Sequence, residues 1–278
     1  MHAVTGAVSA PARLPSAESV MAQAGSENFT VASAVLGRRR CADLLALYGF
    51  ARLVDDVGDE APGDRAALLD LVEGQLDDIY AGREPDHPLM RTLAATVHER
   101  RLPDGPFRRL IAANRQDQVV TRYETFAQLL DYCQLSAAPV GELVLHVFDA
   151  ATPERVVLSD RVCAALQVIE HLQDIDEDHA RGRVYMPRQD MISVGCDDGA
   201  LVAHANSARR ALIALEARRA RSLLAGGAPL AATLPVRPRL AVAGFVAGGR
   251  CALDALQRSE PRSRRAFARA YLRAAAGR

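Results

Sequence analysis

The 278-residue sequence contains no tryptophan and no lysine, and aromatic residues make up only 5% of it. Its hydrophobic residues are mainly Ala, Leu and Val, whereas Ile, Tyr, Phe and Thr, which favour strands, are scarce. Because Ala, Leu and Arg are strong helix formers, this composition favours long helices over sheets. The sequence also lacks a strand-turn-strand series and an internal repeat. We therefore expect an all-α protein.

The chain also lacks net charge, since 34 basic residues balance 34 acidic ones. A neutral chain has no bulk positive field to attract a polyanion, so we expect no nucleic-acid partner. Every basic residue is an arginine, whose planar guanidinium suits carboxylate and phosphate groups. Small anionic ligands are therefore a better match to this composition than nucleic acid.

No apolar run approaches the roughly 18–20 residues that a membrane span requires, and the N-terminus does not resemble a signal peptide. We therefore expect a cytoplasmic protein. The basic segment 262–273 leaves two alternatives open, a solvated terminal helix or a peripheral contact with the inner face of the membrane. The cysteines are widely spaced and form no CxxC pattern, which indicates reduced packing residues and not a zinc site. They are Cys41, Cys133, Cys163, Cys196 and Cys251.

Residues 1–25 are rich in Ala, Ser, Gly and Pro without a sustained period, so we expect a flexible leader. Residues 26–278 are expected to form one all-α domain. Thr30 lies near its start, where it suits either a helix cap or a hydrogen bond to an anionic ligand. Helical periodicity predicts helices at 64–80, 89–101, 107–123 and 126–148.

The predicted helix 126–148 is the least polar, and its stretch Ser136-Ala-Ala-Pro-Val-Gly141 should kink it. The small residues of this stretch have two interpretations. They allow either a close helix–helix contact or an apolar ligand channel that passes the kink.

A stripe of acidic side chains follows the predicted helix at 166–181. Gln167, Glu170, Asp174 and Asp178 fall within a sector of about 80° at 100° per residue. Like charges at this spacing repel, so a cation should meet the stripe. An arginine or a divalent metal ion would serve, and a solvated acidic face is the alternative.

A second stripe lies on the predicted helix at 41–60. Tyr48, Arg52, Asp55 and Asp59 occupy about 60° of its surface, while leucines and Phe50 cover the neighbouring faces. A mostly buried helix should not carry two aspartates unless they are paired or bound to metal. The alternative is that they lie at an exposed acidic helix end.

If the two stripes face each other across a helical bundle, their carboxylates converge and attract divalent cations. Such ions leave coordination sites for a diphosphate, to which Arg52 and Arg183 could donate hydrogen bonds. Below this site, Ala-, Leu- and Val-rich helices could line a long apolar pocket. An isoprenoid diphosphate has both a charged head and an apolar tail, so it fits both halves.

The sequence at this point resembles the squalene and phytoene synthases, the head-to-head prenyl synthases of the all-α isoprenoid synthase fold. The resemblance rests on the stretch from Tyr48 to Asp59, on Tyr132 with Ala137 and Gly141, and on the stretch from Gln167 to Pro187. It extends from about Asn28 to the C-terminal helix. It implies one helical bundle around a central cavity.

The resemblance also implies roles for particular residues. Magnesium would be bound by Asp55, Asp59, Glu170, Asp174 and Asp178. Catalytic assistance to the departing diphosphate would come from Tyr48, Arg52, Tyr132 and Arg183. Substrate would contact Thr30, Ala137, Gly141, Gln167, Gln173 and Tyr185.

Two positions depart from the common family pattern Asn-x-x-Arg-Asp, because Glu170 replaces the Asn and Gln173 replaces the Arg. The loss of that guanidinium argues against the usual two-substrate condensation. The sequence around these residues is most similar to the hydroxysqualene synthase branch of bacterial hopanoid biosynthesis. That branch implies Mg²⁺-dependent conversion of presqualene diphosphate and water to hydroxysqualene and diphosphate.

It also implies a functional link to a presqualene diphosphate synthase and a hydroxysqualene reductase. The nearest alternative is condensation of two farnesyl diphosphates to presqualene diphosphate, squalene or dehydrosqualene. A non-enzymatic all-α interaction module is the alternative from a different class of protein.

Overall fold

The computed structural model describes residues 13–22, 37–258, 270–271 and 273–275. These residues form helices, with one isolated backbone bridge and no strand, which confirms the all-α prediction. The helices are α1 (Ala17–Met21), α3 (Arg38–Asp59), α4 (Arg65–Tyr80), α5 (Pro88–Arg100), α6 (Gly105–Asp117), α7 (Phe126–Ser136), α8 (Ala138–Val147), α9 (Pro153–Gln173), α10 (Ile175–Ala180), α11 (Arg188–Ser193), α12 (Asp198–Val202), α13 (Ser207–Gly227), α14 (Leu230–Thr233) and α15 (Val236–Arg258).

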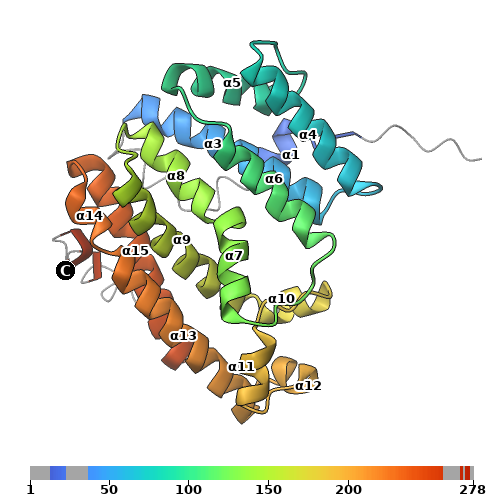
Figure 1. Ribbon diagram of the computed structural model, residues 1–278, viewed down its shortest axis with the longest axis vertical. Coiled ribbons are helices and arrows are strands. Elements are labelled where there is room, and N and C mark those ends of the chain that lie inside the picture. The colour runs from blue at the N-terminus through green and yellow to red at the C-terminus, as the bar shows by residue number, and fades with distance from the viewer. Residues whose placement is uncertain (1–12, 23–36, 259–269, 272, 276–278) are drawn as a thin grey trace, which may run out of the picture.

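Two groups of helices pack against each other (Figure 1). In the first group, α3 packs against α4, α5 and α6. In the second, α9 packs along α13, and both contact α15. Helix α8 contacts α3, α6 and α9 and so connects the groups. The core between α3 and α6 includes the fully buried Phe50 and Phe107, whose rings meet edge to face at 5.0 Å.

Polar caps begin several helices near the predicted residues. The Asp64 carboxylate accepts from the Ala67 backbone N–H and starts α4. Thr125 caps α7, and Thr152 caps α9 directly before Pro153, which suits the first helical turn. The predicted helices at 64–80 and 89–101 therefore correspond closely to α4 and α5.

The helix predicted at 107–123 is shorter in the structure, where α6 ends at Asp117. The next residues pair with a distant part of the chain: the Val184 N–H donates to the Thr121 carbonyl, and the Arg188 N–H donates to the Tyr123 carbonyl. The backbone of 121–124 thus finds partners outside any helix. Periodicity within 107–123 could not reveal a partner segment so far away in sequence.

The predicted kink in 126–148 is present as a break between α7 and α8 at Ala137, with Pro139 in the first turn of α8. A Cβ atom on Gly141 would lie 2.3 Å from Ser159 Oγ and 2.6 Å from Cys163 Sγ, both on α9. Close contact between α8 and α9 therefore accounts for the small residue at 141.

Part of the expected flexible leader forms structure. Ser16 caps the short helix α1, Val20 is fully buried, and His87 Nε2 lies 2.9 Å from the Pro15 carbonyl oxygen. The burial of Val20 explains the difference, because it stabilises this short helix although the surrounding sequence lacks helical periodicity. Thr30 and the basic segment 262–269 lie outside the described residues.

Among the described helices, none has the length and apolar character to cross a bilayer. All five cysteines are free, in agreement with the expectation of reduced packing residues.

Candidate active site

The stripe on α3 lies against α6 and is held by side chains on both helices. Asp55 Oδ1 accepts a hydrogen bond from Asn114 Nδ2 of α6 at 3.0 Å. Arg52 lies on the same face, with its Nε 2.7 Å from Asp56 Oδ1 and its Nη2 3.4 Å from Glu60 Oε1. The arginine is thus paired within its own helix. The sequence prediction for Arg52 had not identified these two carboxylates as its partners.

The sequence predicted one continuous helix at 166–181, but the second stripe is divided between two helices. Helix α9 ends at Gln173, Asp174 is the junction, and α10 begins at Ile175. Repulsion between the crowded carboxylates and the loss of regular backbone geometry at Asp174 coincide at this point. The break leaves Glu170 on α9, Asp174 at the junction and Asp178 on α10.

A salt bridge joins the stripe on α3 to the segment that follows α10. Arg183, which follows α10, places Nη2 2.6 Å from Asp59 Oδ1 of α3, although the residues are 124 positions apart. A pocket of about 240 Å³ opens beside this contact, with lining residues from both helices. They are Arg52, Asp55, Asp59, Glu60, Glu177 and Arg181. The stripe on α3 therefore faces α10 and the residue that follows it, while Glu170 of the second stripe is near enough for its charge to act on Asp55.

Asp55 is the most perturbed carboxyl group of the pocket. It reaches solvent through the pocket, yet protein surrounds it on the other sides, and this burial raises its pKa to about 6. The hydrogen bond from Asn114 lowers the pKa, while the Asp59 charge and the Glu170 charge of α9 raise it. Burial likewise raises the pKa of Asp174, followed in importance by the charge of Asp178. Burial thus makes Asp55 and Asp174 harder to ionise than a free aspartate.

Within the described residues, no group of three or more His, Cys, Asp or Glu side chains is arranged closely enough to hold a metal ion by itself. Asp55 and Asp59 of the predicted metal ligands have protein partners on α6 and after α10. Asp178 Oδ2 lies 3.7 Å from His171 Nδ1. A cation at this site would therefore need ligands beyond the side chains of one stripe.

Tyrosines surround a buried carboxylate at the end of α6. Asp117 Oδ2 accepts a hydrogen bond from Tyr132 at 2.6 Å, and Oδ1 accepts one from Tyr185 at 3.2 Å. Tyr123 stacks on Tyr185, whose other neighbour is His171 with ring centroids 3.8 Å apart. Burial raises the pKa of Asp117. The site thus combines acidic side chains with a cluster of aromatic rings.

Asp117 and His171 were not among the predicted site residues. No pattern in the sequence indicated that Asp117 would accept hydrogen bonds from Tyr132 and Tyr185. The partners are 15 and 68 residues away, so no local spacing signals the cluster. Tyr132 and Tyr185, by contrast, were predicted and do lie together, 5.6 Å between ring centroids.

The remaining predicted contact residues are not among those that line the pocket. Gln167 Nε2 lies 3.4 Å from His171 Nε2 and so borders the aromatic cluster. Tyr48 is half-buried on α3, and Gln173 is exposed at the end of α9. Ala137 and Gly141 lie at the α7–α8 break, where Gly141 contacts α9. The long apolar pocket below the charged site stays a prediction.

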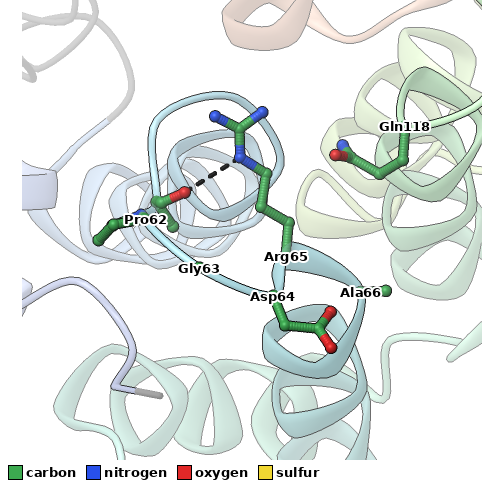
Figure 2. A pocket seen from close by; sticks show the side chains of 7 residues that line it. Pro62, Gly63, Asp64, Arg65, Ala66 and Gln118 are labelled. Atoms are coloured by element: carbon green, nitrogen blue, oxygen red, sulfur yellow. Dashed lines mark hydrogen bonds between the residues drawn. The ribbon is translucent and has the colours of Figure 1, made fainter. Parts of the chain in front are cut away.

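A second hollow, of about 510 Å³, opens at the turn between α3 and α4 (Figure 2). Arg65 and Gln118 project toward it, and Arg65 Nε donates to the Ala61 carbonyl at 3.0 Å. Gln118 Nε2 also donates to the carbonyls of Gly58 and Asn114, which ties the ends of α3 and α6 together. None of the predicted site residues lines this hollow.

Comparison with known proteins relates this geometry to one family. The squalene/phytoene synthase family matches residues 22–275. The hydroxysqualene synthase of Rhodopseudomonas palustris is 36% identical over 214 residues, which are 75% of this chain and 71% of that protein. A second hydroxysqualene synthase, from Sinorhizobium fredii, is 35% identical over 213 residues, which are 73% of this chain and 70% of that protein.

The structures agree with the sequences. The crystal structure of a squalene synthase from Alicyclobacillus acidocaldarius has a TM-score of 0.81 at 41% identity, with 87% of this chain and 92% of that chain covered. A dehydrosqualene synthase in complex with a ligand has a TM-score of 0.83 over 94% of each chain, and its 24% identity shows the fold alone. The chain is therefore an enzyme that belongs to the squalene/phytoene synthase family.

Proposed function

We propose that this enzyme converts presqualene diphosphate and water to hydroxysqualene and diphosphate, in a reaction that depends on Mg²⁺. Enzymes of this family act on farnesyl-type diphosphates. Within the family, hydroxysqualene synthases from three bacteria share 35–36% identity with this chain over more than 200 residues each. The Glu170 and Gln173 departures from the common family pattern support the same branch.

The observation that carries the proposal is the charged pocket between α3 and α10. Carboxylates line it from both sides, and the arginines Arg52, Arg181 and Arg183 lie in or beside it. Carboxylate oxygens are the ligands that Mg²⁺ takes in proteins, and the ion usually completes its shell with water and substrate phosphates. A pocket with incomplete ligand sets on two helices suits an ion that binds together with a diphosphate.

In this proposal, Asp55 and Asp59 would hold magnesium on α3, and Glu170, Asp174 and Asp178 would hold it on α9 and α10. When bound, the ion would neutralise charge on the departing diphosphate. Arg183 would exchange part of its contact with Asp59 for a hydrogen bond to a phosphate oxygen, and Arg52 would do the same from its pairs with Asp56 and Glu60. Arg52 lines the pocket, and Arg183 contacts Asp59, which lines it.

The reaction begins when the carbon–oxygen bond to diphosphate breaks and the leaving group takes the electron pair. The resulting carbocation rearranges, a water oxygen forms the new bond to carbon, and a proton is lost. Aromatic ring faces stabilise a nearby cation. Tyr48, Tyr132 and Tyr185 would serve in this way, with Tyr132 and Tyr185 held by Asp117. Thr30, Ala137, Gly141, Gln167 and Gln173 would contact the substrate.

The test is product analysis by mass spectrometry after incubation with presqualene diphosphate, with and without Mg²⁺ and in the absence of a reductant. We expect hydroxysqualene and free diphosphate only when Mg²⁺ is present. A parallel incubation with farnesyl diphosphate should give no product. Turnover of farnesyl diphosphate, with presqualene diphosphate left intact, would show that the enzyme belongs to the condensing branch and would contradict the proposal.

A further inference from the structure

Helix α10 carries Glu177, which lines the pocket, and the predicted metal ligand Asp178, but few contacts within the helix hold it in place. It is six residues long, and Ile175 is its one buried residue. Isolated helices shorter than roughly 12–15 residues are marginal in water. Asp176, Glu177 and Asp178 also crowd into its first turn, directly after Asp174. Contacts from outside the helix must therefore hold it in place.

The strongest such contact comes from α13. Asp176 is about 200° around the helix from Asp178, so the two side chains point in different directions. Its two carboxylate oxygens accept hydrogen bonds from Arg209 Nη1 at 2.7 Å and Nη2 at 3.0 Å. Arg209 lies in the first turn of α13 and is only 8% exposed. A bidentate pair of this kind fixes orientation as well as distance.

Arg209 is itself fixed. Its Nη1 also donates to the Leu201 carbonyl of α12 at 2.6 Å. Helix α12 is in turn linked to the segment after α6, because the Arg122 guanidinium forms a bidentate pair with Asp198. The same segment pairs with Val184, one residue beyond Arg183. These contacts thus connect α13, through α12 and the segment after α6, to the turn that carries Arg183, the partner of Asp59.

We propose that Arg209 is a positioning residue, which holds α10 through Asp176 and so keeps Asp174 and Asp178, on either side of Asp176 in the sequence, in place. The inference rests on the proposed function, in which those two aspartates bind magnesium with the diphosphate. Arg209 touches neither the pocket nor its acids. It acts through the orientation of α10.

The experiment titrates the full-length protein with Mg²⁺ in the presence of inorganic pyrophosphate and measures binding by calorimetry. We expect Arg209→Gln to raise the Mg²⁺ concentration for half-saturation by roughly 10- to 100-fold, as when a partner that orients a metal ligand is lost. Arg209→Lys restores one hydrogen bond and should give an intermediate value. The control is Arg221→Gln, which removes another α13 arginine whose partner is Asp254 of α15, and it should bind like the wild type.

Hydrogen exchange gives a second readout that does not depend on bound metal. Amides of 174–183 should exchange faster in Arg209→Gln than in Arg221→Gln, while those of α9 stay unchanged. If Arg209→Gln does not fold, Asp176→Asn takes its place with the same expectations, since it breaks the pair on an exposed side of α10.

Normal Mg²⁺ binding by a folded variant that lacks the Arg209–Asp176 pair would overturn this inference alone. Failure of the wild-type protein to bind Mg²⁺ and pyrophosphate would overturn the proposed function and this inference with it.

Discussion

The glycine at position 58 shows how a single residue controls the geometry of the pocket. Asn114 packs directly on Gly58 and donates to Asp55 Oδ1. A Cβ atom at position 58 would lie 2.0 Å from Asn114 Oδ1, a distance that two atoms cannot share. The hydrogen bond that orients Asp55 therefore depends on the absence of a side chain three residues later.

We predict that Gly58→Ala lowers the free energy of unfolding by about 1–3 kcal/mol, as overpacking of a tight contact does. The measurement is urea denaturation, with the decrease in midpoint compared with that of Gly74→Ala. Gly74 lies within α4 and has open space around it, so its substitution should stabilise by about 0.5–1 kcal/mol through helix propensity. Equal effects of the two substitutions would contradict the steric explanation.

At the scale of helices, α3 is joined to α5 by two ion pairs that differ in burial. Asp43 accepts from Arg100 Nε at 2.9 Å and Nη2 at 2.6 Å, and the two side chains are 6% and 14% exposed. Arg39 also pairs with Glu99, but there the side chains are 74% and 40% exposed. The same two helices thus provide a buried pair and an exposed pair.

We predict that Arg100→Met destabilises the protein by about 3–5 kcal/mol, because it leaves the Asp43 carboxylate buried without its partner. Arg39→Met should cost less than about 1 kcal/mol, since solvent screens the exposed pair. Replacement of both buried partners, Asp43→Leu with Arg100→Met, should recover most of the loss. A thermodynamic cycle from chemical denaturation measures all three, and a double variant as unstable as Arg100→Met would refute the argument.

At the scale of the whole molecule, one buried acidic pair makes stability depend on pH. Glu216 of α13 is fully buried beside Asp190 of α11, and both share Arg219, whose Nη1 lies 3.0 Å from Glu216 Oε1. The Arg219 guanidinium also lies over the Phe126 ring of α7. Burial raises the pKa of Glu216 to about 8 from its ordinary 4.5. One guanidinium cannot compensate two buried carboxylates, so Glu216 keeps its proton.

Between pH 4.5 and 8 the folded state therefore binds this proton while the unfolded state has released it. Stability due to Glu216 must fall as the pH rises, with a slope of at most about 1.4 kcal/mol per pH unit. We predict a flatter dependence of the unfolding free energy on pH for Glu216→Gln over this range. The measurement is urea denaturation at several pH values, and parallel curves for the two proteins would contradict the assignment.

Local patterns were enough to predict the helical class, the positions of α4 and α5, the kink near Pro139, and the residues of both acidic stripes. These features depend on neighbours within a few positions, because helix propensity, capping and i, i+4 spacing are local. The family resemblance came from the same residues. The sequence alone also led to the prediction that the two stripes would meet.

The tertiary structure decided which parts of the chain lie beside the stripe on α3. The Arg183–Asp59 salt bridge, the Asp117 tyrosine cluster and the Arg209–Asp176 pair all join residues that are distant in sequence. No periodicity records such pairs, because each depends on the packing of whole helices and on which buried charges find partners there. Sequence determined which side chains were available for the site, and the packing of helices determined which of them came into contact.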